Sequence, residues 1–79
     1  MSAEPARRAF RVRTRTRGGY DGATMYDVQL QAVATGNLMW AQTFTDELQA
    51  RAFEADLERD LTELEDEEFR RKYSVPSAP

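Results

Sequence analysis

The 79-residue sequence contains no cysteine and no histidine. These absences exclude disulfide and thiol chemistry, thiolate and imidazole metal ligands, and the commonest general base of enzymes. The single lysine, Lys72, lies in a segment that we expect to be an exposed turn, so serine and threonine hydroxyls lack an obvious activating base. We therefore expect a protein that is not an enzyme, that needs no cofactor or metal, and in which no small-molecule ligand is indicated.

Long apolar runs are also missing. No run approaches the ~20 residues that a membrane-spanning helix needs, and the first ten residues, MSAEPARRAF, lack the apolar segment of a secretory signal. We expect a cytoplasmic protein that does not contact membranes. With 41% hydrophobic and 32% charged residues, the composition is that of an ordinary soluble domain with a single core.

Charge is distributed unevenly along the chain. Residues 1–20 carry six arginines against one acidic residue, a balance of +5, whereas residues 21–79 carry five basic and thirteen acidic residues, a balance of −8. Such polarity suits an anionic partner at one end, or copies of the chain that meet head to tail. Net charge alone does not choose between these partners.

Strict alternation of side chains predicts strands in the first half of the sequence. Residues 9–17, AFRVRTRTR, place an arginine at every second position, and residues 24–34 alternate in the same way. The glycine-rich residues 18–22 predict a turn between them, and residues 35–37 predict a short hairpin loop before a third strand at 38–44. We expect an antiparallel meander whose middle strand is central.

The facing of the third strand is the least defined of the three. We place Trp40 and Phe44 inside, so Gln42 must lie near the sheet edge or find a partner, because an unpaired buried amide costs ~1–3 kcal/mol. Counting residues in the same way across the turn between the first and second strands places Arg15 opposite Asp27. The predicted pairs of the second and third strands are Ala34 with Leu38, Ala32 with Trp40, and Val28 with Phe44.

A long helix is predicted from Asp46 to Leu64, and we expect Thr43 or Thr45 to cap its first turn. Its apolar residues recur at steps of three and four, which is typical of a helix that docks on a flat surface. They are Leu48, Ala52, Phe53, Leu57, Leu61 and Leu64. The periodicity slips near Asp66, where we expect a break before a short second helix whose acidic residues precede its basic residues by four positions.

These elements predict an α+β fold, namely a three-stranded antiparallel meander packed on one long helix, with a short C-terminal helix. We expect one domain at residues 9–73, between a flexible N-terminus at 1–8 and a flexible tail at 74–79. The residues that periodicity directs toward one another form the expected core. They are Val28, Leu30, Trp40, Phe53, Leu57 and Leu61.

Residues 37–57, NLMWAQTFTDELQARAFEADL, show a weak family resemblance. This W-x-x-x-F strand running into a helix rich in alanine and glutamate resembles the corresponding junction in the DNA-binding domains of plant ethylene-response factors and in phage-integrase arm-binding domains. The resemblance implies a three-stranded sheet laid into the major groove of DNA, with the helix behind it.

The outer face of the sheet is the candidate interaction surface. We predict a small interaction module that self-associates or docks on a larger protein through this face. The alternative is binding of nucleic acid through the arginine-lined first strand, since guanidinium groups ~6–7 Å apart can follow phosphates or base edges. The candidate residues are Arg11, Arg13, Arg15, Arg17, Gln29, Gln31, Val33 and Met39.

Overall fold

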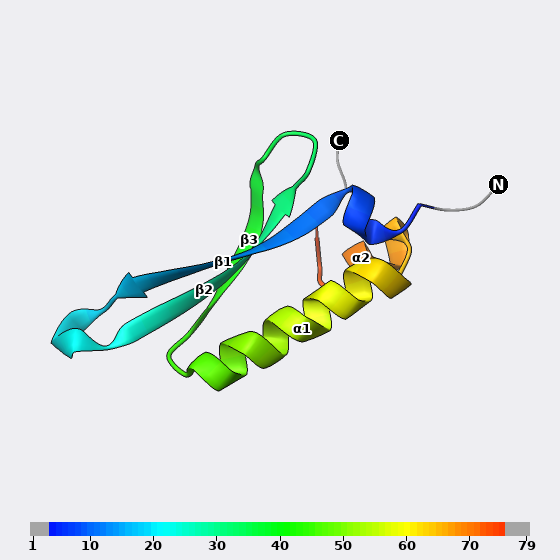
Figure 1. Cartoon of the computed structure of the whole chain (residues 1–79). Helices are drawn as coiled ribbons and strands as arrows, with labels where there is room; N and C mark the ends of the chain where they lie inside the picture. The colour runs from blue at the N-terminus through cyan, green and yellow to red at the C-terminus, as the bar shows by residue number, and fades with distance from the viewer. Residues whose placement is uncertain (1–3, 76–79) are drawn as a thin grey trace.

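The computed structural model describes residues 4–75, in which the three strands precede the two α-helices along the chain (Figure 1). Of the flexible segments predicted at residues 1–8 and 74–79, the parts at 1–3 and 76–79 lie outside the described residues. The elements in chain order are η1 (Ala6–Arg8), β1 (Phe10–Gly18), η2 (Tyr20–Gly22), β2 (Thr24–Ala32), β3 (Leu38–Phe44), α1 (Glu47–Glu63) and α2 (Asp66–Lys72).

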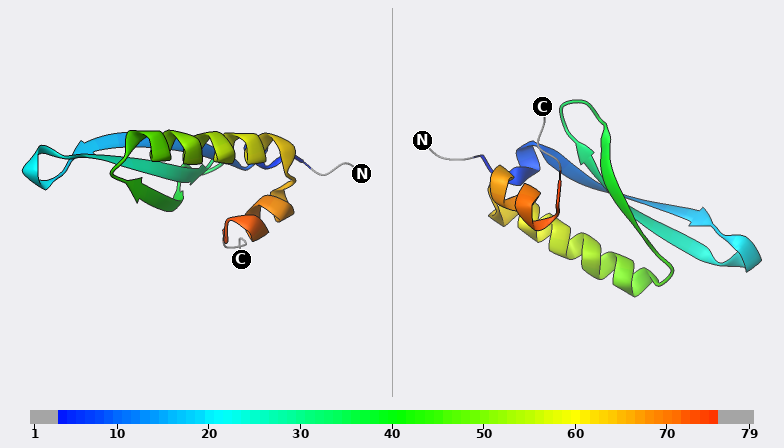
Figure 2. Two further views of the ribbon diagram at one scale, coloured as in Figure 1. Left: turned by 90° about the horizontal axis from the view of Figure 1, so that it is seen from below. Right: turned by 180° about the vertical axis from the view of Figure 1, so that it is seen from behind.

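The three strands form one antiparallel sheet in the order β1-β2-β3, which confirms the predicted α+β fold. Both helices lie on the same side of this sheet, with α1 running along it and α2 folding back beneath it (Figures 1 and 2). We call the helix-free side the open face. Within residues 4–75, no helix is long and apolar enough to cross a membrane.

The register of β1 on β2 agrees with the sequence, because Arg15 lies opposite Asp27. The predicted register of β3 was wrong by two residues, since Trp40 lies opposite Leu30 and not opposite Ala32. The reason is the longer loop, in which the Ala32 C=O accepts from the Gly36 N–H at 2.7 Å while Gly36 takes a φ of +75°. A shift of two residues preserves the alternation, so Trp40 still faces the helices.

A β-bulge in β3 overturns the predicted facing of Leu38 and Met39. The irregularity falls between Leu30 and Gln31 of β2, where Trp40 pairs with Leu30 but Leu38 pairs with Gln31. One extra residue reverses the alternation that follows it. Leu38, expected inside, therefore lies on the open face and is 55% exposed, whereas Met39, expected outside, packs against the core.

Helix α1 begins where the sequence predicted but presents a rotated face to the sheet. The Asp46 carboxylate, and not Thr43 or Thr45, caps the helix by accepting from the Leu48 N–H at 2.9 Å. Leu48 itself is 75% exposed, while Ala50 is buried in its place. The first turns of α1 face threonines of β1 across a groove, so this end of the helix has no apolar surface to dock on.

Four of the six predicted core residues are buried, and the other two, Trp40 and Phe53, are half-buried with ring centroids 5.9 Å apart. The sequence missed the contribution of both chain ends. Phe10 of β1 stacks on Phe69 of α2 at 5.7 Å between centroids. The further buried hydrophobic residues are Ala6, Phe10, Ala50, Phe69 and Val75.

The ends of the described chain are packed where flexibility was expected. The Ala6 N–H donates to the Leu64 C=O at 2.9 Å, and Pro5 forms a β-bridge with Glu65. At the other end, the Val75 N–H donates to the Arg70 C=O at 2.9 Å, and Val75 is buried. The folded unit therefore extends beyond residues 9–73 on both sides.

The predicted break near Asp66 is present, and the two helices are joined across it by a buried carboxylate. Asp60 accepts from the Lys72 ammonium at 2.8 Å and from the Tyr73 hydroxyl. The hydrogen bond from Lys72, followed by that from Tyr73, holds the pKa of Asp60 below its ordinary value. Burial, together with the bond to Asp60, raises the pKa of Tyr73. Lys72, expected in an exposed turn, thus ties α2 to α1.

We predict that Leu57→Ala lowers the free energy of unfolding by ~2–5 kcal/mol, because Leu57 is fully buried and its truncation leaves a cavity. Leu48→Ala is the matched control on the same helix, and we expect a change within ~0.5 kcal/mol because Leu48 is exposed. Urea unfolding followed by circular dichroism measures both values. Equal losses in the two variants would show that α1 docks in a different rotation.

Candidate functional site

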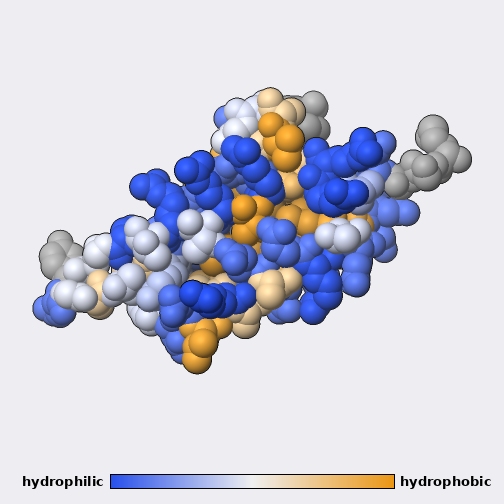
Figure 3. Space-filling model, in the orientation of Figure 1, coloured by the Kyte–Doolittle hydropathy of each residue, from blue (hydrophilic) through white to orange (hydrophobic). Residues whose placement is uncertain are grey.

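The open face carries a row of four arginines from β1 beside polar residues of β2. Alternation along β1 brings Arg11, Arg13, Arg15 and Arg17 to this side, and all four are exposed. Their partners across the strands are, in order, Gln31, Gln29, Asp27 and Met25. In the space-filling view, hydrophilic side chains gather along the upper left of the molecule, over these strands (Figure 3).

The four arginines differ in what they bind. The Nε of Arg11 donates to the Gln31 amide oxygen at 3.1 Å, and the Nε of Arg17 donates to the Asp27 carboxylate at 2.8 Å. Arg13 and Arg15 make no side-chain hydrogen bond or ion pair with any residue in the described part of the chain. The centre of the row therefore offers two guanidinium groups to a partner.

Asp27 is the one acidic residue in the strands, and its charge is compensated within the face. Besides Arg17, the Thr43 hydroxyl of β3 donates to it at 2.7 Å. The hydrogen bond from Arg17, then that from Thr43, lowers the pKa of Asp27 below its ordinary value of 3.8. Because its side chain is only 14% exposed, Asp27 places little uncompensated negative charge on the open face.

The structure brings seven of the eight predicted residues together on the open face and leaves one out. Val33 follows β2 on this side and is 47% exposed. Met39 packs against the core because of the bulge, and Leu38 takes its place. The alternation of the sequence gave no signal for this exchange.

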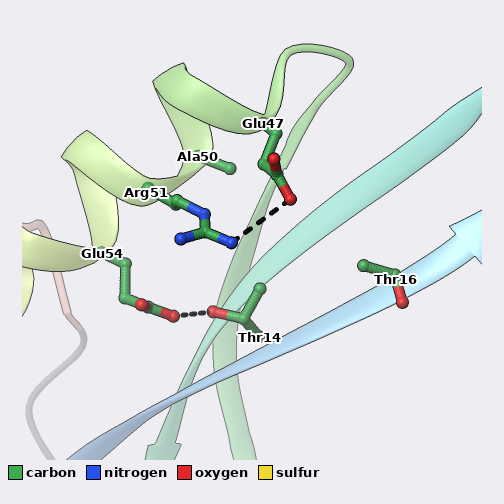
Figure 4. A pocket seen from close by; sticks show the side chains of 6 residues that line it. All are labelled: Thr14, Thr16, Glu47, Ala50, Arg51 and Glu54. Carbon is green, nitrogen blue, oxygen red and sulfur yellow. Dashed lines mark hydrogen bonds and ion pairs between the residues drawn. The ribbon is translucent and has the colours of Figure 1, made fainter.

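A groove of about 540 Å³ between β1 and the first half of α1 was not anticipated (Figure 4). Four of the five polar residues that line it pair with one another, since the Thr14 hydroxyl donates to Glu54 and the Arg51 guanidinium lies 3.4 Å from the Glu47 carboxylate. No set of three or more acidic side chains within residues 4–75 is arranged to hold a metal ion. The groove offers satisfied polar groups, whereas the open face offers free ones.

Comparison with known proteins gives no match to a protein-family model, to a curated protein or to a solved structure. The resemblance of residues 37–57 to two DNA-binding families therefore stays a prediction.

We predict that the Asp27 carboxyl titrates below pH 3.8, and that Arg17→Met raises its pKa toward that value. The lowered pKa means that the bonds of Asp27 stabilise the fold above its ordinary pKa, and that this contribution is lost as the pH falls through the lowered value. Side-chain carboxyl NMR measures the midpoint. Arg13→Met is the control, and a midpoint raised equally by both variants would contradict the direct bond.

Proposed function

We propose that the chain is a binding module, not an enzyme, and that its open face binds duplex DNA. The observation that carries the proposal is the row of four exposed arginines on a helix-free face whose only strand acid, Asp27, is already bound by Arg17 and Thr43. Phosphate contacts from arginine supply most of the non-specific affinity of proteins for nucleic acid.

The charge layout favours one orientation on an anionic polymer. The acidic residues of α1 and α2 lie on the opposite side of the sheet from the arginines. A polyanion is therefore attracted to the open face and repelled by the helical side, although the net charge of the chain is −3.

The aromatic residues favour a duplex over a single strand. Those of the strands, Phe10, Tyr26, Trp40 and Phe44, all lie on the helix-covered face, where they belong to the core or pack against it. Proteins that bind single strands without sequence preference stack bases on exposed aromatic side chains. The strands of the open face instead present arginine and glutamine, which bind phosphates and the edges of paired bases.

The dimensions of the sheet agree with those of a DNA groove. Two steps between three strands span ~10 Å, and the major groove is ~12 Å wide. Arg13 lies directly across from Gln29, and the Arg11 guanidinium already binds Gln31. Arginine makes bidentate contacts with guanine, and glutamine makes them with adenine. Each of these neighbouring pairs therefore offers one side chain of each kind to the base edges.

Docking on a protein, including a second copy, through the same face is the second candidate. Exposed Val33 and Leu38 at the loop end of the face favour it. The bulge leaves this apolar surface about as large, because Leu38 replaces the withdrawn Met39. Two copies stacked face to face would, however, bring their arginine rows together, and like charges repel.

The test is a titration of labelled duplex DNA at two salt concentrations. Because Arg17 is held by Asp27, we expect three arginine–phosphate contacts, and the affinity should fall about fortyfold between ~50 and ~200 mM salt. Arg13→Ser with Arg15→Ser should reduce the slope of log affinity against log salt by about 1.8. Fluorescence anisotropy measures both quantities.

A charge-matched control separates the open face from the helical side. Arg51→Ser with Arg71→Ser removes the same charge from exposed positions on α1 and α2, and it should leave the slope unchanged. The proposal fails if no duplex binds at ~50 mM salt with tens of micromolar protein. It also fails if the control pair weakens binding as much as the test pair, or if single strands bind more tightly.

A further inference from the structure

The free edge of β3 lacks the features with which proteins usually prevent strands from pairing between molecules. The strand Leu38–Phe44, LMWAQTF, contains no charged residue and no proline. Its bulge lies at one end, so residues 40–44 pair regularly with β2. The other edge strand, β1, carries an arginine at every second position. Charge and proline are common means of protecting an edge, so β1 is protected and β3 is not.

The backbone of this edge has no partner beyond β2 in the described chain. The backbone hydrogen bonds outside helices and strands include none from residues 38–44, within the part of the chain that the structure describes. In an antiparallel pair, every second residue of an edge strand directs its N–H and C=O groups away from its neighbour. These groups are available to another strand.

The side chains at this edge include an unmatched donor and an exposed acceptor. The indole Nε1 of Trp40 is buried without a hydrogen-bond partner among the described residues, and a buried unpaired donor costs ~1–3 kcal/mol. Gln42, two residues along on the same face, is exposed. Both line a hollow of about 390 Å³ beside β3, together with Phe53 and Tyr73.

We propose that β3 pairs antiparallel with β3 of a second copy of this chain, around a two-fold axis at Ala41, to give a continuous six-stranded sheet. In this register Gln42 of each copy lies directly opposite Trp40 of the other. Opposed residues have Cβ atoms ~4.5–5.5 Å apart, so Gln42 of each copy reaches the hollow beside Trp40 of the other. The Trp40 Nε1 is covered in the single chain, and a small rotation of the ring in the dimer lets it donate to the Gln42 amide oxygen. A two-fold axis forms this bond twice.

The charges are compatible with this arrangement. The arginine rows lie on the two outermost strands, five strand spacings apart, which is ~24 Å. This separation exceeds the Debye length of ~8 Å at physiological salt, so the rows repel weakly. The two open faces join side by side into one surface. The use of that larger surface for DNA rests on the proposed function, whereas the dimer itself does not.

The test uses charge at the two-fold axis. Ala41 is exposed on the open face, so Ala41→Lys leaves the core intact but sets two like charges against each other in the dimer. We expect the wild-type chain to be a dimer by light scattering at tens of micromolar, and Ala41→Lys and Ala41→Glu each to be monomers. An equimolar mixture of the two variants should recover the dimer, because opposite charges then meet at the axis. Ala34→Lys, the same change in the exposed loop, should stay dimeric.

The Trp40–Gln42 register has its own readout. Gln42→Ala should weaken the dimer about tenfold, because it removes two hydrogen bonds to buried donors. NMR should show the indole N–H resonance of Trp40 shifted downfield in the wild-type dimer, where it donates to Gln42, and not in Ala41→Lys, where it is buried without a partner.

Several outcomes would overturn the proposal. A wild-type monomer would do so, as would a dimer that survives Ala41→Lys, or a mixture of the two charged variants that stays monomeric. Loss of the dimer in Val33→Glu but not in Ala41→Lys would place the contact on the open face instead. Circular dichroism of each variant shows that it is folded, and the recovery by mixing excludes misfolding as the cause of dissociation.

Discussion

The contact on which the rest of the structure depends is the burial of Leu57 and Leu61 of α1 against Val28 and Leu30 of the sheet. One face of three short strands supplies the sheet side of this core, and Ala6, Phe69 and Val75 from the two chain ends complete it. Asp60, on the same helix, then holds α2 on that side through Lys72. Both helices therefore pack on one face of the sheet. The arginine row stays uncovered because it lies on the other face.

Period-two alternation in the sequence was enough to predict the open face, because every arginine of β1 falls on one side and Arg15 lies opposite Asp27. It was not enough for β3. A bulge is a backbone event whose cause lies in the pairing with β2 and in the loop, so the exchange of Leu38 and Met39 leaves no trace in the order of side chains. The exposure of Leu48 could not be predicted from the helix sequence either, because it depends on which residues of β1 lie opposite the first turns of α1.

Acidic residues were the hardest to interpret from the sequence. Asp27 stands amid the arginines of the open face, yet the hydrogen bonds from Arg17 and Thr43 already compensate its carboxylate. Asp60 is one of many acidic residues in α1, yet it is buried and joins two helices. In both cases the effect of the charge is decided by a partner that is distant in sequence. Composition and local spacing therefore show where a charge occurs in the sequence, but not whether another side chain of the fold already neutralises it.

The open face and the free edge of β3 do not compete for the same partner. Side chains on a sheet point along its normal, whereas the unpaired N–H and C=O groups of an edge lie in its plane. A strand added at β3 therefore enlarges the open face without covering it, while stacking two faces would bury the arginines. A duplex that contacts both copies would meet the second row at a high effective concentration. By linkage, a ligand that binds the dimer better than the monomer also stabilises the dimer. Edge pairing and phosphate contacts across the two rows would thus strengthen each other, whereas a six-stranded sheet ~24 Å wide could not enter a single major groove ~12 Å wide.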